Sequence, residues 1–233
     1  MKPFNAIDTW IFDLDNTLYA PQHNLFTQID KRMTAFIAAY LNLDKQEARR
    51  LQKDYLHAHG LTLFGLMKHH NMAPDAFLEF VHDIDVSALP PDAALAAAIK
   101  NLAGRKFIFT NSTRAHAVNV MTRLGIVDLF EGIFDIVDAA FTPKPQALPY
   151  EAMLKKFAVC PAQAAFFEDR AENLRPAKAC GMATILVSAN KNSDTNNDAA
   201  LAKTDYIDYH TDDLSGFLVE IDFLCRADSL NMK

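Results

Sequence analysis

The segment Phe12-Asp13-Leu14-Asp15-Asn16-Thr17-Leu18 is the stretch that decides how this chain folds. It continues the apolar run of residues 9–12, which is short and nearly unbroken, as expected for a strand covered on both faces of a parallel sheet. Asp13 and Asp15 stand two residues apart where this strand gives way to a turn, so both carboxylates can face one cleft. Crowded carboxylates favour a divalent cation or a shared proton, although a solvated acidic turn or a helix cap gives the same local pattern.

Further apolar runs alternate with segments of helical periodicity, which indicates an α/β domain with a parallel sheet. We expect additional strands at residues 106–109, 134–137, 164–167 and 184–187, and an edge strand at Tyr206-Ile207. Helices are expected between these strands at residues 91–103, 115–124, 148–157 and 173–180.

The stretch from about residue 25 to residue 84 breaks this alternation. Helical spacing of apolar residues or a helix-opening proline marks residues 25–41, 46–59, 61–70 and a segment that begins at Pro74. A helical block therefore lies between the first and second strands of the sheet. We predict a Rossmann-like parallel sheet core formed by residues 1–20 and 88–233, with a helical cap domain, residues 21–87, inserted into it.

Charge and composition narrow the class of partner. The net charge of −6, from 29 acidic and 23 basic residues, disfavours a nucleic-acid binder that depends on a basic face. No apolar run approaches the ~20 residues of a membrane span, and acidic residues soon interrupt the apolar N-terminal stretch, which argues against a signal peptide. Three cysteines without a CxxC pair fit a reducing compartment. We expect a soluble, cytoplasmic protein that acts on a small molecule.

Three more predicted strand ends carry polar residues, and ligands of open parallel sheets bind beyond the carboxyl ends of the strands. Thr110-Asn111-Ser112 offers a hydroxyl and backbone N–H groups to phosphate oxygens, Lys144 stands between two prolines, and Glu168-Asp169 adds carboxylates for a metal. Each feature alone is also typical of a helix cap, a surface loop or a strand-end turn. Together they supply what phosphoryl transfer needs: a nucleophile, a metal and groups that hold charged oxygens.

These four sites resemble, in order, the four motifs of the haloacid dehalogenase-like superfamily. Residues 12–18 are similar to its first motif, DxDx(T/V), and Thr110-Asn111 to its second. Lys144 is similar to the third motif, and residues 168–173 to the fourth. The resemblance extends from Trp10 to about residue 187 and implies an α/β phosphatase that uses an aspartate as its nucleophile.

The resemblance also implies a role for each matching residue. Asp13 would attack phosphorus and form an aspartyl-phosphate. Asp15 would protonate the leaving oxygen and then activate the hydrolytic water. Thr110, Asn111 and Lys144 would hold the phosphoryl group.

A Mg²⁺ cofactor is implied by the same resemblance. Asp13, the backbone carbonyl of Asp15 and Asp169 would bind the ion, and Glu168 would help directly or through water. Asn173 stands where many relatives have an aspartate, which favours an indirect role for it. Dehalogenases of the superfamily lack an acid at the place of Asp15, so its presence favours phosphate chemistry.

The inserted helices resemble the type-1 cap of this superfamily. Residues 60–66 and 82–85 are also similar to the pyrimidine 5′-nucleotidase-like subfamily. This narrower resemblance implies a pyrimidine nucleoside 5′-monophosphate as substrate, with Thr62 and Phe64 as candidate contacts to the nucleotide. The same residues could instead belong to the packed interior of the cap.

Other functions remain open at this point. Within enzymes, the alternatives are a sugar-phosphate or phosphoglycolate phosphatase and a phosphomutase of the β-phosphoglucomutase kind. A phospho-acceptor module of the receiver type also carries an acidic pair, but receivers are about half as long and have no helical insertion after the first strand. An inactive binding scaffold is disfavoured by the intact pair of Asp13 and Asp15.

Overall fold

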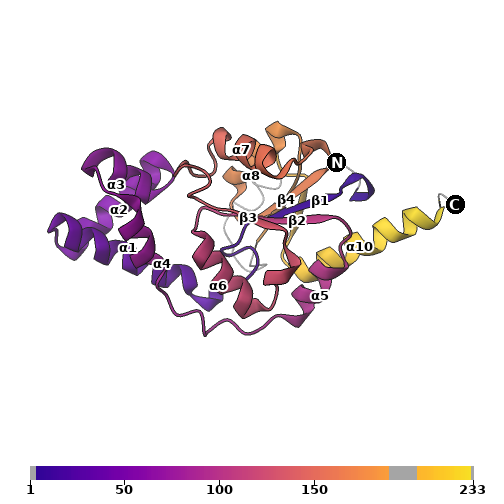
Figure 1. Ribbon diagram of the computed structural model, residues 1–233, viewed down its shortest axis with the longest axis horizontal. Helices are drawn as coiled ribbons and strands as arrows, with labels where there is room; N and C mark the ends of the chain where they lie inside the picture. The colour runs from indigo at the N-terminus through magenta and orange to yellow at the C-terminus, as the bar shows by residue number, and fades with distance from the viewer. Residues whose placement is uncertain (1–3, 189–203, 232–233) are drawn as a thin grey trace.

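The computed structural model describes residues 4–188 and 204–231, which form a parallel sheet covered by helices (Figure 1). Within these residues the sheet has six strands in the order β3-β2-β1-β4-β5-β6. The strands are β1 (Thr9–Phe12), β2 (Arg105–Phe109), β3 (Gly132–Phe134), β4 (Ala164–Glu168), β5 (Ala183–Val187) and β6 (Tyr209–Thr211). Phe12 at the end of β1 is in register with Ile108 on β2 and Phe167 on β4. The chain therefore leaves these three central strands at the same edge of the sheet.

Helices cover both faces of the sheet, which confirms the predicted α/β class (Figure 1). One face carries α5 (Ala93–Asn101), α6 (Arg114–Leu124) and α10 (Leu214–Asn231), and the other carries α7 (Ala147–Phe157) and α8 (Ala171–Cys180). Short 3₁₀ helices form at Phe4–Ala6, Pro21–His23, Val127–Leu129 and Pro161–Gln163. Alternate residues of β1 serve the two layers: Trp10 and Phe12 pack with the first group of helices, and Ile11 packs with the second.

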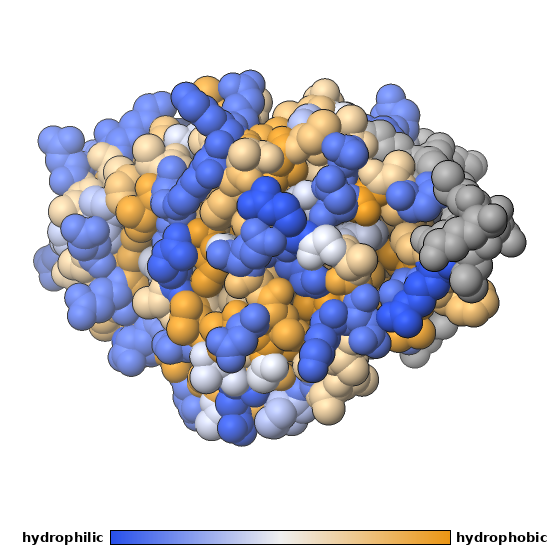
Figure 2. Space-filling view, turned by 45° about the vertical axis from the view of Figure 1, so that its right-hand side comes forward, coloured by the Kyte–Doolittle hydropathy of each residue, from blue (hydrophilic) through white to orange (hydrophobic). Residues whose placement is uncertain are grey.

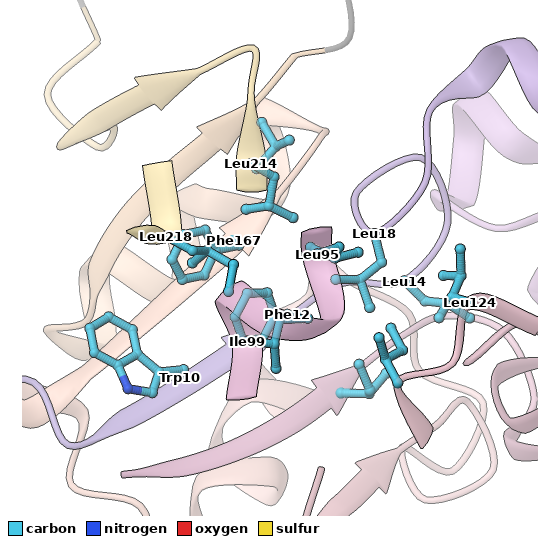
Figure 3. Close-up of a cluster of buried hydrophobic side chains, with 14 of the residues drawn as sticks. Trp10, Phe12, Leu14, Leu18, Leu95, Ile99, Leu124, Phe167, Leu214 and Leu218 are labelled. Carbon is cyan, nitrogen blue, oxygen red and sulfur yellow. The ribbon is translucent and has the colours of Figure 1, made fainter. Parts of the chain in front are cut away.

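Trp10 anchors the larger of the two hydrophobic layers (Figure 3). Its side chain is 1% exposed, and its indole Nε1 donates a hydrogen bond to the carbonyl oxygen of Ala103 at 2.7 Å. Two residues further on, the Phe12 ring stacks on Phe167 with centroids 4.6 Å apart. Burying each such ring contributes on the order of 2–3 kcal/mol. This packing fixes β1, and with it the acidic residues that follow, to the centre of the sheet.

Four further helices, separate from those on the two faces, lie to one side of the sheet (Figure 1). It consists of α1 (Leu25–Leu41), α2 (Lys45–His59), α3 (Thr62–His70) and α4 (Pro74–His82). These helices share a hydrophobic cluster of their own, which includes Ile37, Leu66 and Phe77. Asp44 begins α2 with a capping box. A Cβ at Gly65 would lie 2.4 Å from the Tyr55 ring, so glycine lets α3 approach α2 closely.

Two predicted strands are wrong in position. The run at residues 134–137 was expected to be a strand, but β3 ends at Phe134 because the Asp135 carboxylate accepts hydrogen bonds from the backbone N–H groups of Arg114 and Asp138 and turns the chain. Tyr206-Ile207 was expected to form the edge strand, which instead begins at Tyr209. The Thr184 side chain donates a hydrogen bond to the Tyr206 carbonyl, which holds the segment just before β6.

Hydrophilic and hydrophobic residues are interspersed over the face shown in Figure 2. No helix in the described ranges combines the length and the apolar character that crossing a membrane requires.

Candidate active site

A cavity of about 330 Å³ lies between the carboxyl edge of the sheet and helices α1–α4. The core contributes the residues that follow β1, β2 and β4, together with Lys144, and the opposite wall comes from α1, α2, α4 and the start of α3. The predicted residues that line it are Asp13, Asp15, Thr62, Thr110, Asn111, Lys144, Glu168, Asp169 and Asn173. Phe64 is the one predicted site residue outside this lining.

Lys144 is the buried centre of the site. Its Nζ donates hydrogen bonds to Asp13 Oδ1 and Glu168 Oε2, both at 2.7 Å, and to the carbonyl of Phe109 at 2.9 Å, and the residue is 2% exposed. Burial alone would lower the pKa of Lys144, but Asp13 and Glu168 hold it above its ordinary value. The lysine is therefore charged, and it joins the ends of β1 and β4.

Asn111 positions the loop that carries this lysine. Its side-chain Oδ1 accepts a hydrogen bond from the backbone N–H of Lys144 at 2.9 Å, and its Nδ2 donates to the Lys144 carbonyl at 3.2 Å. Thr110 is 2% exposed, and its hydroxyl oxygen accepts a hydrogen bond from the backbone N–H of Ser112 at 3.0 Å. The Thr110 hydroxyl keeps its own proton for a ligand in the cavity.

Three carboxylates come together around Lys144. Asp13, Glu168 and Asp169 each offer one oxygen, and these oxygens all lie within 4.8 Å of one another. Burial, together with Glu168, raises the pKa of Asp13 to about 7 and that of Asp169 to about 10. One lysine cannot balance three acids, so the cluster favours either a retained proton or a divalent cation.

Two buried amide oxygens without hydrogen-bond partners bear on whether a hard cation fits this site. Among the described residues, Asn16 Oδ1 and Asn173 Oδ1 are buried without a hydrogen-bond partner, and both residues line the cavity. Buried oxygens are normally paired, and Mg²⁺ with its waters takes oxygen ligands. The donor set at this edge of the sheet, three carboxylates with the amide oxygens of Asn16 and Asn173 beside them, therefore fits Mg²⁺.

Asp15 faces a different set of partners from Asp13. Its Oδ1 accepts hydrogen bonds from Tyr19 Oη at 2.6 Å and from His116 Nε2 at 2.8 Å, and its Oδ2 accepts one from Ser112 Oγ at 2.6 Å. Burial alone would raise the pKa of Asp15, but His116, Ser112 and Tyr19 hold it well below its ordinary value. Asp15 is thus an ionised carboxylate whose orientation is fixed by three hydrogen-bond donors.

Sequence reasoning placed Ser112 only within the phosphate-binding segment 110–112, and it assigned no role to Tyr19 or His116. Tyr19 follows Asp15 by four residues, a spacing that brings side chains together in a helical turn. Ser112 directly follows the Thr110-Asn111 pair that was recognised. No sequence signal singles out His116, because only the fold brings α6 to the end of β1.

The cavity wall formed by helices α1–α4 carries its own polar cluster around Asp30. Lys53 Nζ and Gln52 Nε2 each lie 2.9 Å from Asp30 Oδ1, and Arg49 forms an ion pair with the same carboxylate. Asp30, Gln52 and Lys53 line the cavity, and none of them was predicted as a site residue.

The two predicted cap contacts have other partners. The Thr62 hydroxyl donates a hydrogen bond to the Gln52 carbonyl at 3.0 Å, so it ties α3 to α2 at the cavity wall. The Phe64 ring packs against His59, with ring centroids 5.8 Å apart.

A model of the haloacid dehalogenase-like hydrolase family matches residues 7–181, most of the chain, and the protein belongs to this family. Among curated proteins, it is 32% identical over 202 residues to phosphate metabolism protein 8 of Saccharomyces cerevisiae. That match covers 79% of this chain and 62% of the yeast protein, so the chain spans less than two thirds of its relative.

Solved structures share the fold at low sequence identity. A HAD phosphatase from Thermococcus onnurineus is 16% identical with a TM-score of 0.59, and the match covers 94% of this chain and 97% of that one. An L-2-haloacid dehalogenase from Xanthobacter autotrophicus, with chloropropionic acid covalently bound, is also 16% identical with a TM-score of 0.56, covering 94% and 98%. Because a phosphatase and a dehalogenase match alike, the likeness identifies the fold and leaves the reaction to the site.

Proposed function

We propose that this hydrolase is a Mg²⁺-dependent phosphomonoesterase that forms an aspartyl-phosphate on Asp13. The observation that carries the proposal is the gathering of three carboxylates, two buried and one half-buried, around one lysine, with Asp15 oriented nearby as a separate proton carrier. A site with this excess of negative charge needs a cation before it can receive a phosphate dianion. The acid at position 15, which dehalogenases of the superfamily lack, favours a phosphate ester over a haloacid as substrate.

In this proposal Asp13 is the nucleophile. A carboxylate oxygen of Asp13 bonds to phosphorus as the ester P–O bond breaks. Asp15 takes up a proton from solvent when the phosphate anion binds beside it and raises its pKa, and it then gives this proton to the leaving oxygen. Asp15 then takes a proton from the water that attacks the aspartyl-phosphate, which restores free Asp13 and releases inorganic phosphate. Thr110 and Lys144 hold the phosphoryl oxygens throughout.

The metal ligands in this proposal are Asp13, Asp169 and the backbone carbonyl of Asp15. Bound Mg²⁺ would neutralise phosphoryl oxygens and orient them for in-line attack. Glu168 already accepts hydrogen bonds from Lys144 on one oxygen and from the backbone N–H of Arg170 on the other. We therefore assign Glu168 mainly to holding Lys144, and Asn173 to a position beside the metal.

We propose a pyrimidine nucleoside 5′-monophosphate as the substrate and residues 21–87 as the cap that closes over it. The cap wall presents apolar residues such as Met33 and Leu56 together with the polar Gln52 and Lys53. An apolar wall with a few polar groups suits a flat ligand with hydrogen-bonding edges, such as a nucleobase. Thr62 lines this wall through its side chain or backbone, whereas Phe64 would reach a substrate only after a rearrangement.

A phosphate-release screen tests the proposal. Wild-type protein with Mg²⁺ is offered UMP, CMP, sugar phosphates and phosphoglycolate, with and without a chelator, and a 2-haloacid serves as the comparison substrate. We expect release of inorganic phosphate from the nucleotides, abolished by the chelator. Full activity after exhaustive chelation, or release of halide instead, would overturn the proposed chemistry. A preference for sugar phosphates, or an isomerised sugar phosphate as product, would overturn the nucleotidase assignment alone.

A further inference from the structure

We propose that His116 is a positioning residue for the Asp15 carboxylate, and that His82 at the end of the cap couples this position to the placement of the cap. The inference rests on the proposed phosphatase function, which assigns the proton transfers to Asp15. It concerns His116, which belongs to none of the sequence motifs, and His82, which lies in the segment 82–85 of the subfamily resemblance but has no part in the proposed mechanism.

His116 is buried in α6 with one ring nitrogen directed at Asp15. The side chain is 1% exposed, and its Nε2 lies 2.8 Å from Asp15 Oδ1. The start of α6 is fixed on both sides, because Thr113 caps the helix by accepting a hydrogen bond from the His116 backbone N–H, and the Arg114 backbone N–H donates to Asp135. His116 therefore holds Asp15 from the rigid core of the protein.

His82 places the end of helix α4, which belongs to the cap, in contact with His116. It is the last residue of α4, and its ring lies against the His116 ring, with centroids 4.9 Å apart. Its Nδ1 lies 3.0 Å from the Leu78 carbonyl within α4 and 3.5 Å from Thr113 Oγ1 in the core. The final turn of the cap thus rests on the side chain that holds Asp15, so a displacement of α4 would change the support of His116.

The position of Asp15 matters most when the leaving oxygen needs a proton. Displacing a reacting group by about 1 Å can cost ~10²-fold in rate, and general acid catalysis is worth ~10²–10⁴-fold. An ester with a weakly basic leaving oxygen departs with little help from an acid, whereas a more basic one depends on it. A displaced Asp15 should therefore slow the second kind of ester more than the first.

Phenyl phosphate and p-nitrophenyl phosphate provide this contrast, since they differ little in shape but greatly in the basicity of the leaving oxygen. With Mg²⁺ present, His116→Ala should lose about tenfold more kcat on phenyl phosphate than on p-nitrophenyl phosphate. His116→Gln should restore most of the additional kcat lost on phenyl phosphate, because its amide can still donate a hydrogen bond to Asp15. His82→Ala should shift the ratio in the same direction by about threefold, and adding it to His116→Ala should shift the ratio no further.

His59→Ala is the matched control. His59 is also a half-buried histidine that ends a cap helix, but its Nε2 lies 3.1 Å from His69 Nε2, away from Asp15. Its substitution should leave the ratio of the two rates unchanged. If His116→Ala fails to fold, His116→Met takes its place, because methionine fills a similar volume without donating a hydrogen bond.

The outcomes separate this inference from the function on which it rests. Equal losses on both esters in the His116 variants, while Asp15→Asn shows a selective loss, would make His116 a packing residue and overturn the inference alone. An unchanged ratio in His82→Ala would overturn the coupling to the cap. Absence of phosphate release by the wild-type protein would overturn the proposed function and this inference together.

Discussion

The two ends of the cavity hold acid–base clusters of opposite balance. At the core end, three carboxylates surround Lys144, whose side chain is 1% exposed. At the cap end, Asp30 faces both Arg49 and Lys53, whose side chains are 44% and 39% exposed. Burial alone would raise the pKa of Asp30, but these two cations hold it below its ordinary value. The core cluster has more acids than cations and little exposure, which suits chemistry on an anion with a metal. The cap cluster has more cations than acids and is partly exposed, which suits exchangeable contacts with a substrate.

The largest difference in turnover is expected between a variant of Asp13 in the core cluster and a variant of Asp30 in the cap cluster. Asp13→Asn should reduce turnover of p-nitrophenyl phosphate by at least ~10⁴-fold, because a neutral amide cannot attack phosphorus. Asp30→Asn should lose no more than about tenfold, since Asp30 contacts side chains of the cap rather than the phosphoryl group. Steady-state kinetics with Mg²⁺ measure both, and near-normal turnover by the Asp13 variant would remove the nucleophile assignment.

Lys144 and Lys53 should differ in how much they contribute to the stability of the fold. Lys144→Met leaves Asp13 and Glu168 buried without their shared cation, which should lower the free energy of unfolding by roughly 3–5 kcal/mol. Lys53→Met removes an exposed ion pair and should cost less than about 1 kcal/mol. Urea unfolding of both metal-free variants at one pH measures the difference. Equal losses would show that burial does not distinguish the clusters.

The binding of Mg²⁺ should depend on pH through the core cluster. The folded-state pKa values of Asp13 and Asp169 are raised to about 7 and about 10, so the folded protein without metal holds protons that the unfolded chain releases above its ordinary aspartate pKa of 3.8. The free energy of unfolding of the metal-free protein therefore falls as the pH rises from about 4 through these values. Mg²⁺ displaces the protons, so it should bind more tightly and stabilise more at pH 8 than at pH 6.

Thermal unfolding with and without Mg²⁺ measures this difference. At saturating metal, an increase in Tm of roughly 5–10 °C is expected at pH 8 for a chain of this size, with a smaller increase at pH 6. Asp169→Asn should show little increase at either pH. An equal increase at both values of pH in the wild-type protein would contradict the link between protons and the metal site.

The smallest effects should come from the cap wall. Lys53→Met should change the ratio of kcat/KM for UMP to that for a sugar phosphate by roughly 5–20-fold, because it removes a charged contact at the far end of the cavity. Thr62→Val should act in the same direction but less, and Phe64→Leu least, since Phe64 lies outside the cavity lining. Hydrolysis of p-nitrophenyl phosphate serves as the control. A larger change from Phe64 than from Lys53 would restore the contact expected from the sequence.

The sequence predicts the core end of the cavity far better than the cap end. Residues such as Asp13, Thr110 and Asp169 directly follow apolar runs, and the parallel sheet brings strand ends to one edge, so their convergence follows from topology. Even there, Asp135 was read as part of a strand, because its side-chain contacts with backbone N–H groups leave no trace in the periodicity.

At the cap end, contacts depend on how helices cross, which local patterns do not encode. Helical spacing predicts that residues 25–41 and 46–59 form helices, but it does not reveal that Asp30 meets Lys53 across two of them. For the same reason Thr62 and Phe64 were chosen by resemblance, while the Asp30 cluster and the His82–His116 contact were missed. The sequence predicts which residues come together where strand order determines their position. It does not predict contacts that depend on how side chains of neighbouring helices pack.

Trp10 has a practical consequence for anyone who follows this protein in solution. It is the single tryptophan of the chain and lies in the sheet layer, whereas residues 21–87 contain neither tryptophan nor cysteine. Tryptophan fluorescence therefore reports the unfolding of the core and does not report the unfolding of helices α1–α4. Circular dichroism, or a label attached to a cysteine introduced into residues 21–87, would report on those helices.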